Sequence, residues 1–246
     1  MPLDTGATWL FLLLALAAEV IGTVGGFGSS VFFVPMALLF FGGPVVLGLT
    51  SVLHVFSNLA KLGLFRAGIH RWLVLWMGIP AWVGVAVGAW AVTQVSFRYS
   101  AWLLGGALVV LSTVLLLRPA LHMPKRPVAA GTSGALAGFW AGFTGTGGAI
   151  RGLSMAAFDL PKAVFVATSA AIDLGVDGIR MGIYLSHGFL PPALYPWVPV
   201  LLVVSVAGTW LGRRVLRALP QATFRRLVLL LLLLEGLWLL LREVLA

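Results

Sequence analysis

Ten apolar runs occupy almost the whole of this chain. Proline, glycine and charged residues separate them, and most are long enough to cross a bilayer as a helix, which takes about 20 residues. We place the runs at residues 7–25, 29–42, 44–65, 72–94, 99–118, 129–145, 147–159, 161–186, 190–211 and 226–245. The sequence therefore predicts an all-α, polytopic membrane protein of roughly eight to ten helices.

The composition excludes the soluble alternatives. Hydrophobic residues make up 61% of the 246 residues and charged residues only 9%, whereas soluble domains carry roughly 25% charged residues. Intrinsic disorder is excluded as well, because it requires low hydrophobicity and high charge density. Because the helices use most of the length, we expect no extramembrane domain.

Charge and cysteine content narrow the class further. Sixteen Lys and Arg residues against seven Asp and Glu give a formal net charge of +9, which in a membrane protein orients the loops rather than binding nucleic acid. The chain has no cysteine, so it can form no disulfide, thiolate metal site or cysteine nucleophile. The N-terminus carries Asp4 and lacks the basic region of a signal peptide, so we expect the first run to be a permanent helix. No cofactor, metal or nucleic-acid partner is expected.

The second and seventh runs are too short to cross the membrane. They hold about 14 and 13 residues, and at about 1.5 Å per residue they would reach only about 20 Å of a roughly 30 Å hydrocarbon core. We expect broken or half-spanning helices at 29–42 and 147–159.

The sequence repeats at about half its length. Ordered matches recur about 117 to 120 residues apart, which indicates an internal duplication. The matches are Gly22 with Gly142, Gly25 with Gly145, Gly28 with Gly148, Pro44 with Pro161, and Thr50-Ser51 with Thr168-Ser169. We expect two membrane repeats, residues 1–120 and 121–246.

The two repeats are expected to have opposite orientation. Each half makes an odd number of crossings, whether its short run crosses or turns back, so the second half enters from the other side. The Lys and Arg distribution agrees: by the positive-inside rule, loops 66–71, 118–128 and 212–226 lie in the cytoplasm and both termini on the non-cytoplasmic side of the inner membrane. An inverted repeat with broken helices is the architecture of secondary transporters.

The two Gly-rich breaks are the strongest chemical feature. Glycine permits positive φ and close approach of a ligand to the backbone, and irregular backbone within a membrane must be buried in protein or line a cavity. The helices beginning at Ser29 or Ala149 would also direct free N–H groups at an anion. Alternatively, these glycines serve only close helix packing, as we expect for the Gly-x-x-x-Gly pairs at 84–88, 134–138 and 138–142.

Ionisable residues within the membrane are candidate functional groups. Arg151 falls in the first turn after the second break, where its guanidinium could share an anion with the N–H groups; the alternative is an ion pair with Asp159 or Asp177. Asp173, Asp177 and Arg180 share one helical face and form either a buried ion network or a proton relay. The coupling candidates are Glu19, Asp173 and Asp177.

Hydroxyl and amide groups complete the candidate site. The pairs Thr50-Ser51 and Thr168-Ser169 either donate to an anion or bond back to the carbonyl one turn earlier. A stripe on the third run is interpreted either as packing or as cavity lining, and it consists of His54, Asn58 and Lys61.

Motifs of membrane enzymes fit poorly. Intramembrane aspartyl proteases have Gly-x-Gly-Asp where this chain has Gly175-Val-Asp177-Gly178, and rhomboids have Gly-x-Ser-Gly where it has Gly26-Phe-Gly28-Ser29. There is no His-Glu-x-x-His metal motif. We therefore do not expect an enzyme.

The paired breaks and the later Thr-Ser pairs resemble the sulfite exporter TauE/SafE family, also called the 4-toluenesulfonate uptake permease family. In that family each half carries a G-x-G-G-G-x-x-x-x-P type motif and a later A-T-S. The corresponding segments here are Gly25-Gly26-Phe27-Gly28 with Pro35, Leu49-Thr50-Ser51, Gly145-Thr146-Gly147-Gly148 and Ala167-Thr168-Ser169. Phe27 interrupts the first motif, and no proline follows shortly after Arg151. The resemblance covers nearly the whole chain.

This resemblance implies transport of sulfite, a sulfonate such as sulfoacetate, or another small organic anion across the cytoplasmic membrane, with export as the family-weighted direction. Thiosulfate-uptake relatives use cysteines, which argues against that substrate here. The alternatives are an anion-selective channel and an uptake permease for another small anion. The expected partners are the anion and the lipid bilayer, with a homodimer left open.

The anion is expected at the interface between the repeats. The expected substrate contacts are Gly25, Gly26, Gly28, Thr50, Ser51, His54, Asn58, Gly145, Gly147, Gly148, Arg151, Thr168 and Ser169.

Overall fold

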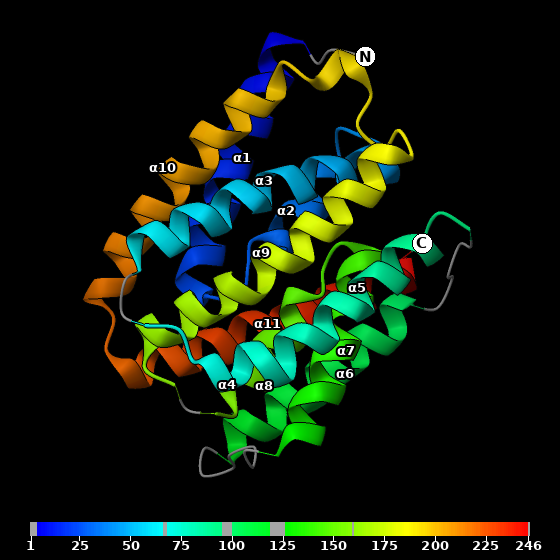
Figure 1. Ribbon diagram of the computed structural model, residues 1–246. Coiled ribbons are helices and arrows are strands. Elements are labelled where there is room, and N and C mark those ends of the chain that lie inside the picture. Colours follow the sequence, from blue (N-terminus) through cyan, green and yellow to red (C-terminus); the bar gives the residue numbers. More distant parts are fainter. Residues whose placement is uncertain (1–3, 66–67, 95–99, 119–125, 159, 246) are drawn as a thin grey trace.

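Every described element of the chain is helical (Figure 1). The computed structural model describes residues 4–65, 68–94, 100–118, 126–158 and 160–245. The elements are α1 (Thr5–Gly25), α2 (Ser30–Ala37), α3 (Gly43–Leu64), α4 (Arg71–Leu73), the π-helical turn η1 (Val74–Gly78), α5 (Ile79–Ala91), α6 (Ser100–Leu117), α7 (Pro127–Thr144), α8 (Gly148–Ala156), α9 (Lys162–Ser186), the 3-10 turn η2 (Pro192–Leu194), α10 (Trp197–Ala218) and α11 (Gln221–Leu245). The predicted all-α fold is confirmed, and each of the ten apolar runs contains a helix.

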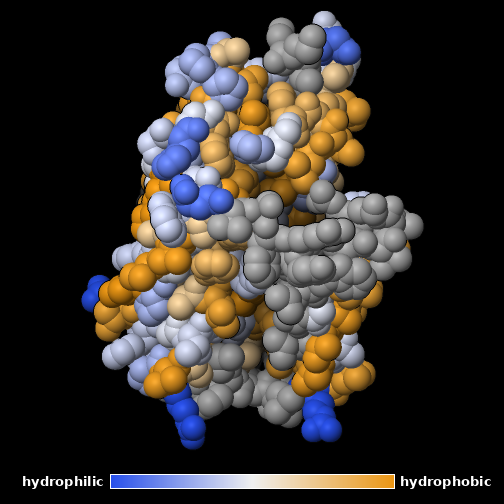
Figure 2. All heavy atoms as spheres, turned by 90° about the vertical axis from the view of Figure 1, so that its right-hand side faces the viewer, coloured by the Kyte–Doolittle hydropathy of each residue, from blue (hydrophilic) through white to orange (hydrophobic). Residues whose placement is uncertain are grey.

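Length and hydropathy make this a multi-pass membrane protein. Among the described residues, four helical segments are long and apolar enough to cross a membrane: Thr5–Gly25, Gly43–Leu64, Arg71–Ala91 and Trp197–Ala218. Large apolar side chains also face outward, among them Trp9, Val83 and Val203, each more than 60% exposed. Hydrophobic residues cover much of the described part of the face in Figure 2. Such a surface is stable against lipid and not against water.

One predicted boundary is wrong. The ninth run, placed at 190–211, forms a helix only from Trp197 to Ala218, because Pro191, Pro192 and Pro196 interrupt helical hydrogen bonding before it. Of the arginines assigned to a loop at 212–226, Arg225 and Arg226 lie on α11, whereas Arg213, Arg214 and Arg217 lie on the last turns of α10. The guanidinium of Arg214 lies 3.7 Å from the ring centroid of Trp210. Cations near a helix C-terminus are favourable, so these arginines need no loop.

Glycines let two pairs of helices approach with their backbones in contact. A Cβ atom on Gly138 of α7 would lie 1.9 Å from the carbonyl oxygen of Ala81 in α5, and one on Gly142 would lie 2.4 Å from that of Val85. This confirms the packing role predicted for the Gly-x-x-x-Gly pairs. On the other side of the molecule, α10 packs against α1 through Gly208 and Gly212. In both pairs the contacting residue numbers rise together, so the two helices run parallel.

Helices α3 and α9 lie side by side at the centre of the molecule (Figure 1). Asn58 contacts Asp177, and further along, Gly48 approaches the backbone of Phe189. Residue numbers rise along one helix as they fall along the other, so α3 and α9 run antiparallel. Helices α6 and α11 form another contacting pair, and α8 touches both of them.

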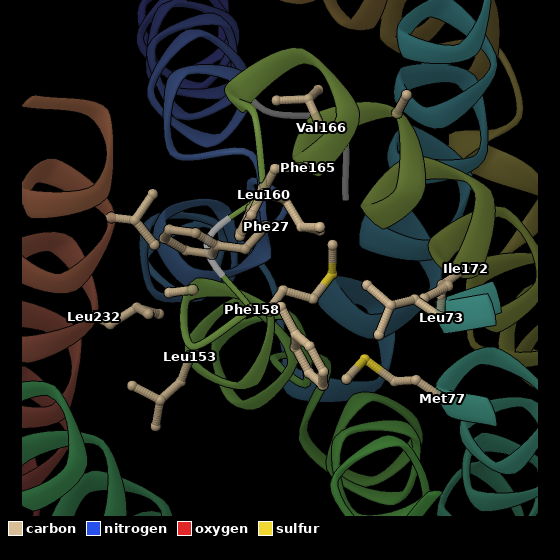
Figure 3. Close-up of a cluster of buried hydrophobic side chains, with 14 of the residues drawn as sticks. Phe27, Leu73, Met77, Leu153, Phe158, Leu160, Phe165, Val166, Ile172 and Leu232 are labelled. Carbon is tan, nitrogen blue, oxygen red and sulfur yellow. The ribbon is translucent and has the colours of Figure 1, made fainter. Parts of the chain in front are cut away.

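Phe27, from the segment between α1 and α2, is buried in the larger of the apolar clusters. Figure 3 shows its ring close to Leu160 and Phe165, with Leu153 and Phe158 nearby. These neighbours come from α8, from the segment before α9 and from α9 itself. The first Gly-rich break is therefore enclosed by side chains of the second half of the chain.

Candidate functional site

Each Gly-rich break contains a left-handed glycine that ends the preceding helix. Gly26, with φ of +75°, directly follows α1 as its C-cap, and Gly145, with φ of +81°, directly follows α7 as its C-cap. Glycine adopts this left-handed conformation without strain, so each segment ends a long helix and allows a short one to begin. The short helices α2 and α8 hold 8 and 9 residues, about 12 to 14 Å of rise, and neither can cross the membrane alone.

The two breaks meet at the start of α8. A Cβ atom on Gly148 would lie 2.2 Å from the carbonyl oxygen of Phe27 in the first break. Arg151, three residues further along α8, donates a hydrogen bond from Nη2 to the same carbonyl over 3.0 Å. The second half of the chain therefore holds the backbone of the first break.

Arg151 pairs with Asp173 and is 2% exposed. Its Nη1 and Nη2 contact the two oxygens of the Asp173 carboxylate, and its Nε donates to Ser169 Oγ over 3.3 Å. Asp177 was expected as one alternative ion-pair partner of Arg151, but the partner in the structure is Asp173. Asp159, the other expected alternative, lies outside the described residues. Two parallel N–H donors are the geometry with which arginine also binds planar oxyanions.

Arg180 donates to backbone carbonyls at the second break, as Arg151 does at the first. Its Nη1 donates to the carbonyl oxygens of Ala141 and Gly145 over 3.2 and 3.0 Å. The Ala141 carbonyl also accepts from the backbone N–H of Gly145 over 3.1 Å at the end of α7. Its Nη2 lies 2.8 Å from Asp177 Oδ1, and Asn58 Nδ2 donates to Asp177 Oδ2 over 2.6 Å. Its Nε–H, also buried, has no acceptor among the described residues.

A third polar cluster surrounds Glu19 of α1. The hydroxyls of Ser29 and Ser57 both donate to its carboxylate, the latter over 2.5 Å. Ser29 Oγ also lies 2.9 Å from His54 Nε2, and Lys61 Nζ donates to Ser57 Oγ over 2.8 Å. His54 Nδ1 in turn lies 3.6 Å from Asp177 Oδ2. All of these side chains are buried, so the His54 stripe faces the interior and joins the first break to α9.

The predicted hydroxyl contacts separate into two groups. Thr50 donates to the carbonyl of Val46 over 2.6 Å, and Ser51 donates to that of Gly48 over 2.8 Å, which is the local bonding considered as the alternative. Thr168 accepts from the backbone N–H of His70. Of the four hydroxyls, Ser169 is the one that the structure brings to Arg151.

Some break glycines are in packing contacts. A Cβ atom on Gly147 would lie 2.0 Å from the carbonyl oxygen of Ala137, and one on Gly25 would lie 2.7 Å from the Phe27 ring. Gly28, with φ of +105°, lies beside His54. The glycines thus combine both interpretations: they pack closely, and they bring polar side chains to the backbone of the breaks.

Sequence reasoning did not include Ser29, Ser57 and Thr209 in the site. Ser57 follows His54 by three residues on α3, so helical spacing could have identified it. Ser29 directly follows the first break. Thr209, whose hydroxyl lies 3.5 Å from Ser57 Oγ, belongs to α10, and nothing in the sequence indicates that α10 packs against α1 and α3.

The two breaks differ in what covers them. A cavity of about 260 Å³ reaches the second break, and its lining includes Leu47, Phe143, Thr144 and Phe189. At the first break, the corresponding position is filled by the cluster around Phe27 in Figure 3. A Cβ atom on Gly145 would meet Leu47, whereas one on Gly26 would meet the larger Phe165.

The described residues contain no group of three or more His, Asp or Glu side chains that could hold a metal ion.

Among known proteins, the family model described as sulfite exporter TauE/SafE matches residues 10–239, nearly the whole chain. No curated protein matches the chain.

Proposed function

The chain belongs to the sulfite exporter TauE/SafE family, and from this premise we propose that it is a secondary transporter that exports a small anion of the sulfite, sulfonate or sulfoacetate type across the cytoplasmic membrane. The observation that carries the proposal is Arg151. It is a buried guanidinium at the point where the two Gly-rich breaks meet, in the first turn of a short helix whose N–H groups favour anions.

The anion binds in competition with the Asp173 carboxylate. The two oxygens of Asp173 already accept from the two Nη donors of Arg151, and two oxygens of a sulfite or sulfonate group can accept from the same pair of donors. Ser169 lies beside the same donors. At the second break, the buried Nε–H of Arg180 is a donor that has no acceptor among the described residues.

Alternating access follows from an inverted repeat made of residues 1–120 and 121–246. In support, the counterpart helices α3 and α9 run antiparallel, and α1 pairs with α10 as α7 pairs with α5. With the orientation given by the basic loops, the cavity at the second break opens on the non-cytoplasmic side and the Phe27 cluster closes the cytoplasmic side. During transport the protein alternates between this state and one in which the cytoplasmic side is open and the non-cytoplasmic side is closed.

We expect cysteines introduced at Ile69 and His187 to be labelled from opposite faces of the membrane. Both side chains are exposed, and in the inverted repeat they follow the counterpart helices α3 and α9. Ile69→Cys should react with a membrane-impermeant maleimide only from the cytoplasmic side, and His187→Cys only from the opposite side. The parent chain has no cysteine and is the blank. Labelling of both positions from one side contradicts the inversion.

In proteoliposomes, we expect saturable uptake of labelled sulfite or sulfoacetate, with counterflow when unlabelled anion is trapped inside. Counterflow requires a carrier that returns loaded, because its site alternates between the two sides. An anion channel, the alternative function, would conduct without saturation and without counterflow. Zwitterionic taurine serves as the matched substrate control. Absence of transport for both anions would overturn the proposed function.

We propose that anion transport is coupled to proton movement. A buried ionisable group that changes its proton between the two open states can drive the anion against its gradient. The three buried acids of the described chain are Glu19, Asp173 and Asp177.

A further inference from the structure

The three buried acids differ in their partners. Asp173 is paired with Arg151, and Asp177 with Arg180. Glu19 is fully buried and has no ion-pair partner among the described residues. A buried carboxylate without a cation is unfavourable, and a proton on it removes the charge. Glu19 is therefore the acid whose proton can be gained and lost without breaking an arginine pair.

Hydrogen-bond directions around Glu19 are fixed by the hydroxyls. Ser29 and Ser57 each have one hydroxyl proton, and each donates it to Glu19. Ser57 Oγ accepts in turn from Lys61 Nζ. Ser29 Oγ must likewise accept from His54 Nε2, which lies 2.9 Å away. Neutral His54 thus carries its proton on Nε2, and its Nδ1 is free to accept from Arg180 Nη2 at 3.4 Å.

We propose that Glu19 binds the coupling proton, and that Ser29 and His54 form the relay that connects it to the pair of Asp177 and Arg180. This inference rests on the proposed transporter function. It assigns to Glu19 and His54 a role distinct from that of Arg151, which holds the anion.

One proton moves through the relay in a series of transfers, each of which breaks one O–H or N–H bond and forms another. A proton arriving at His54 Nδ1 releases the proton of Nε2 to Ser29 Oγ, and the hydroxyl proton of Ser29 passes to Glu19 Oε1. Afterwards Glu19 is neutral, and Ser29 donates to His54 Nε2. His54 is again neutral, with its proton on Nδ1. The chain has gained one proton and no covalent bond other than O–H and N–H has changed.

The relay ends on the second break. With its proton on Nδ1, His54 no longer accepts from Arg180 and instead presents an N–H group to Asp177. Arg180 is the residue that holds the carbonyl oxygens of Ala141 and Gly145. Protonation of Glu19, in the first half of the chain, therefore alters the contacts of Arg180, which holds the break of the second half. Coupling requires such a link between the proton site and the second break.

The charged groups around the relay come from several helices. On α3, Lys61 faces Glu19 through Ser57. On α9, Asp177 and Arg180 face His54 directly. Asp173, also on α9, forms an ion pair with Arg151 of α8. Helix α10 contributes the neutral Thr209.

The experiment compares anion exchange with proton-driven accumulation in proteoliposomes. A proton gradient of one pH unit supports about tenfold accumulation when one proton moves per anion. We expect Glu19→Gln to abolish accumulation and the proton flux seen with a trapped pH dye, while counterflow at equal pH stays within about threefold of the parent, because the anion donors are unchanged. Ser29→Ala should have the same effect, because it interrupts the relay.

Ser205→Ala is the matched control. Ser205 is also fully buried and donates to the carbonyl of Leu53, but among the described residues its hydroxyl makes no hydrogen bond to Glu19, Ser29 or His54, so coupling should persist. Proton-driven accumulation by either Glu19→Gln or Ser29→Ala overturns the relay, and so does loss of counterflow in both. Failure of the parent chain to exchange anions is a different result, because it overturns the transporter proposal itself.

Discussion

We expect replacement of Arg151 with glutamine to abolish anion transport, and we expect replacement of Asp173 with asparagine in the same chain not to restore it. The single change removes the donors that hold the anion and leaves Asp173 buried without its cation. Breaking a buried ion pair in this way costs about 3 to 5 kcal/mol. We therefore expect Arg151→Gln to lower both the unfolding temperature and the counterflow rate, the latter by at least about a hundredfold, equivalent to roughly 3 kcal/mol.

The double variant separates anion binding from stability. Arg151→Gln with Asp173→Asn leaves no uncompensated charge, so the unfolding temperature in detergent should return close to that of the parent. Counterflow should stay at the level of the single variant, because the guanidinium is still missing. Recovery of transport together with stability would show that Arg151 serves only the fold. Arg214→Gln, which removes an exposed arginine stacked on Trp210, should change neither quantity appreciably.

Much of the helical arrangement could be predicted because apolar length and glycine position are local properties. The runs identified most helices to within a few residues, and the left-handed turns at Gly26 and Gly145 lie within one residue of the predicted match of Gly25 with Gly145. Helix α10 was misplaced because three prolines delay its start, while Arg213, Arg214 and Arg217 were assumed to require a loop. A cation on the last turns of a helix is favourable, so charge alone does not end it.

The partners of the ionisable residues could not be predicted. Helical spacing placed Asp173 and Asp177 on one face of α9, one turn apart. In the folded chain the first faces Arg151 on α8 and the second faces Asn58 on α3. Which helix lies beside each turn depends on the packing of elements far apart in sequence. Glu19 was named as a coupling candidate, but its contacts with Ser29 and Ser57 could not be predicted for the same reason, because they join α1, the first break and α3.

Gly148→Ala should separate the two breaks and stop transport. The added Cβ atom would lie 2.2 Å from the carbonyl oxygen of Phe27, and this oxygen also accepts from Arg151. No side-chain rotamer can relieve the overlap, because it involves the backbone on one side and Cβ on the other. Overpacking of this kind costs about 1 to 3 kcal/mol and more where the backbone must move. The shift of Phe27 would also remove one hydrogen bond from Arg151.

Gly182→Ala on α9 is the matched control, because apart from its chain neighbours and the backbone of its own helix no atom of the described residues lies within 4 Å of the added Cβ. Alanine in an open helical position stabilises by up to about 1 kcal/mol, so the two identical changes should shift the unfolding temperature in opposite directions. Counterflow should be lost in Gly148→Ala and kept in Gly182→Ala. If Gly148→Ala unfolded at the parent temperature and exchanged anions at the parent rate, close contact between the breaks would be unnecessary. The anion site would then have to lie away from the junction at Arg151.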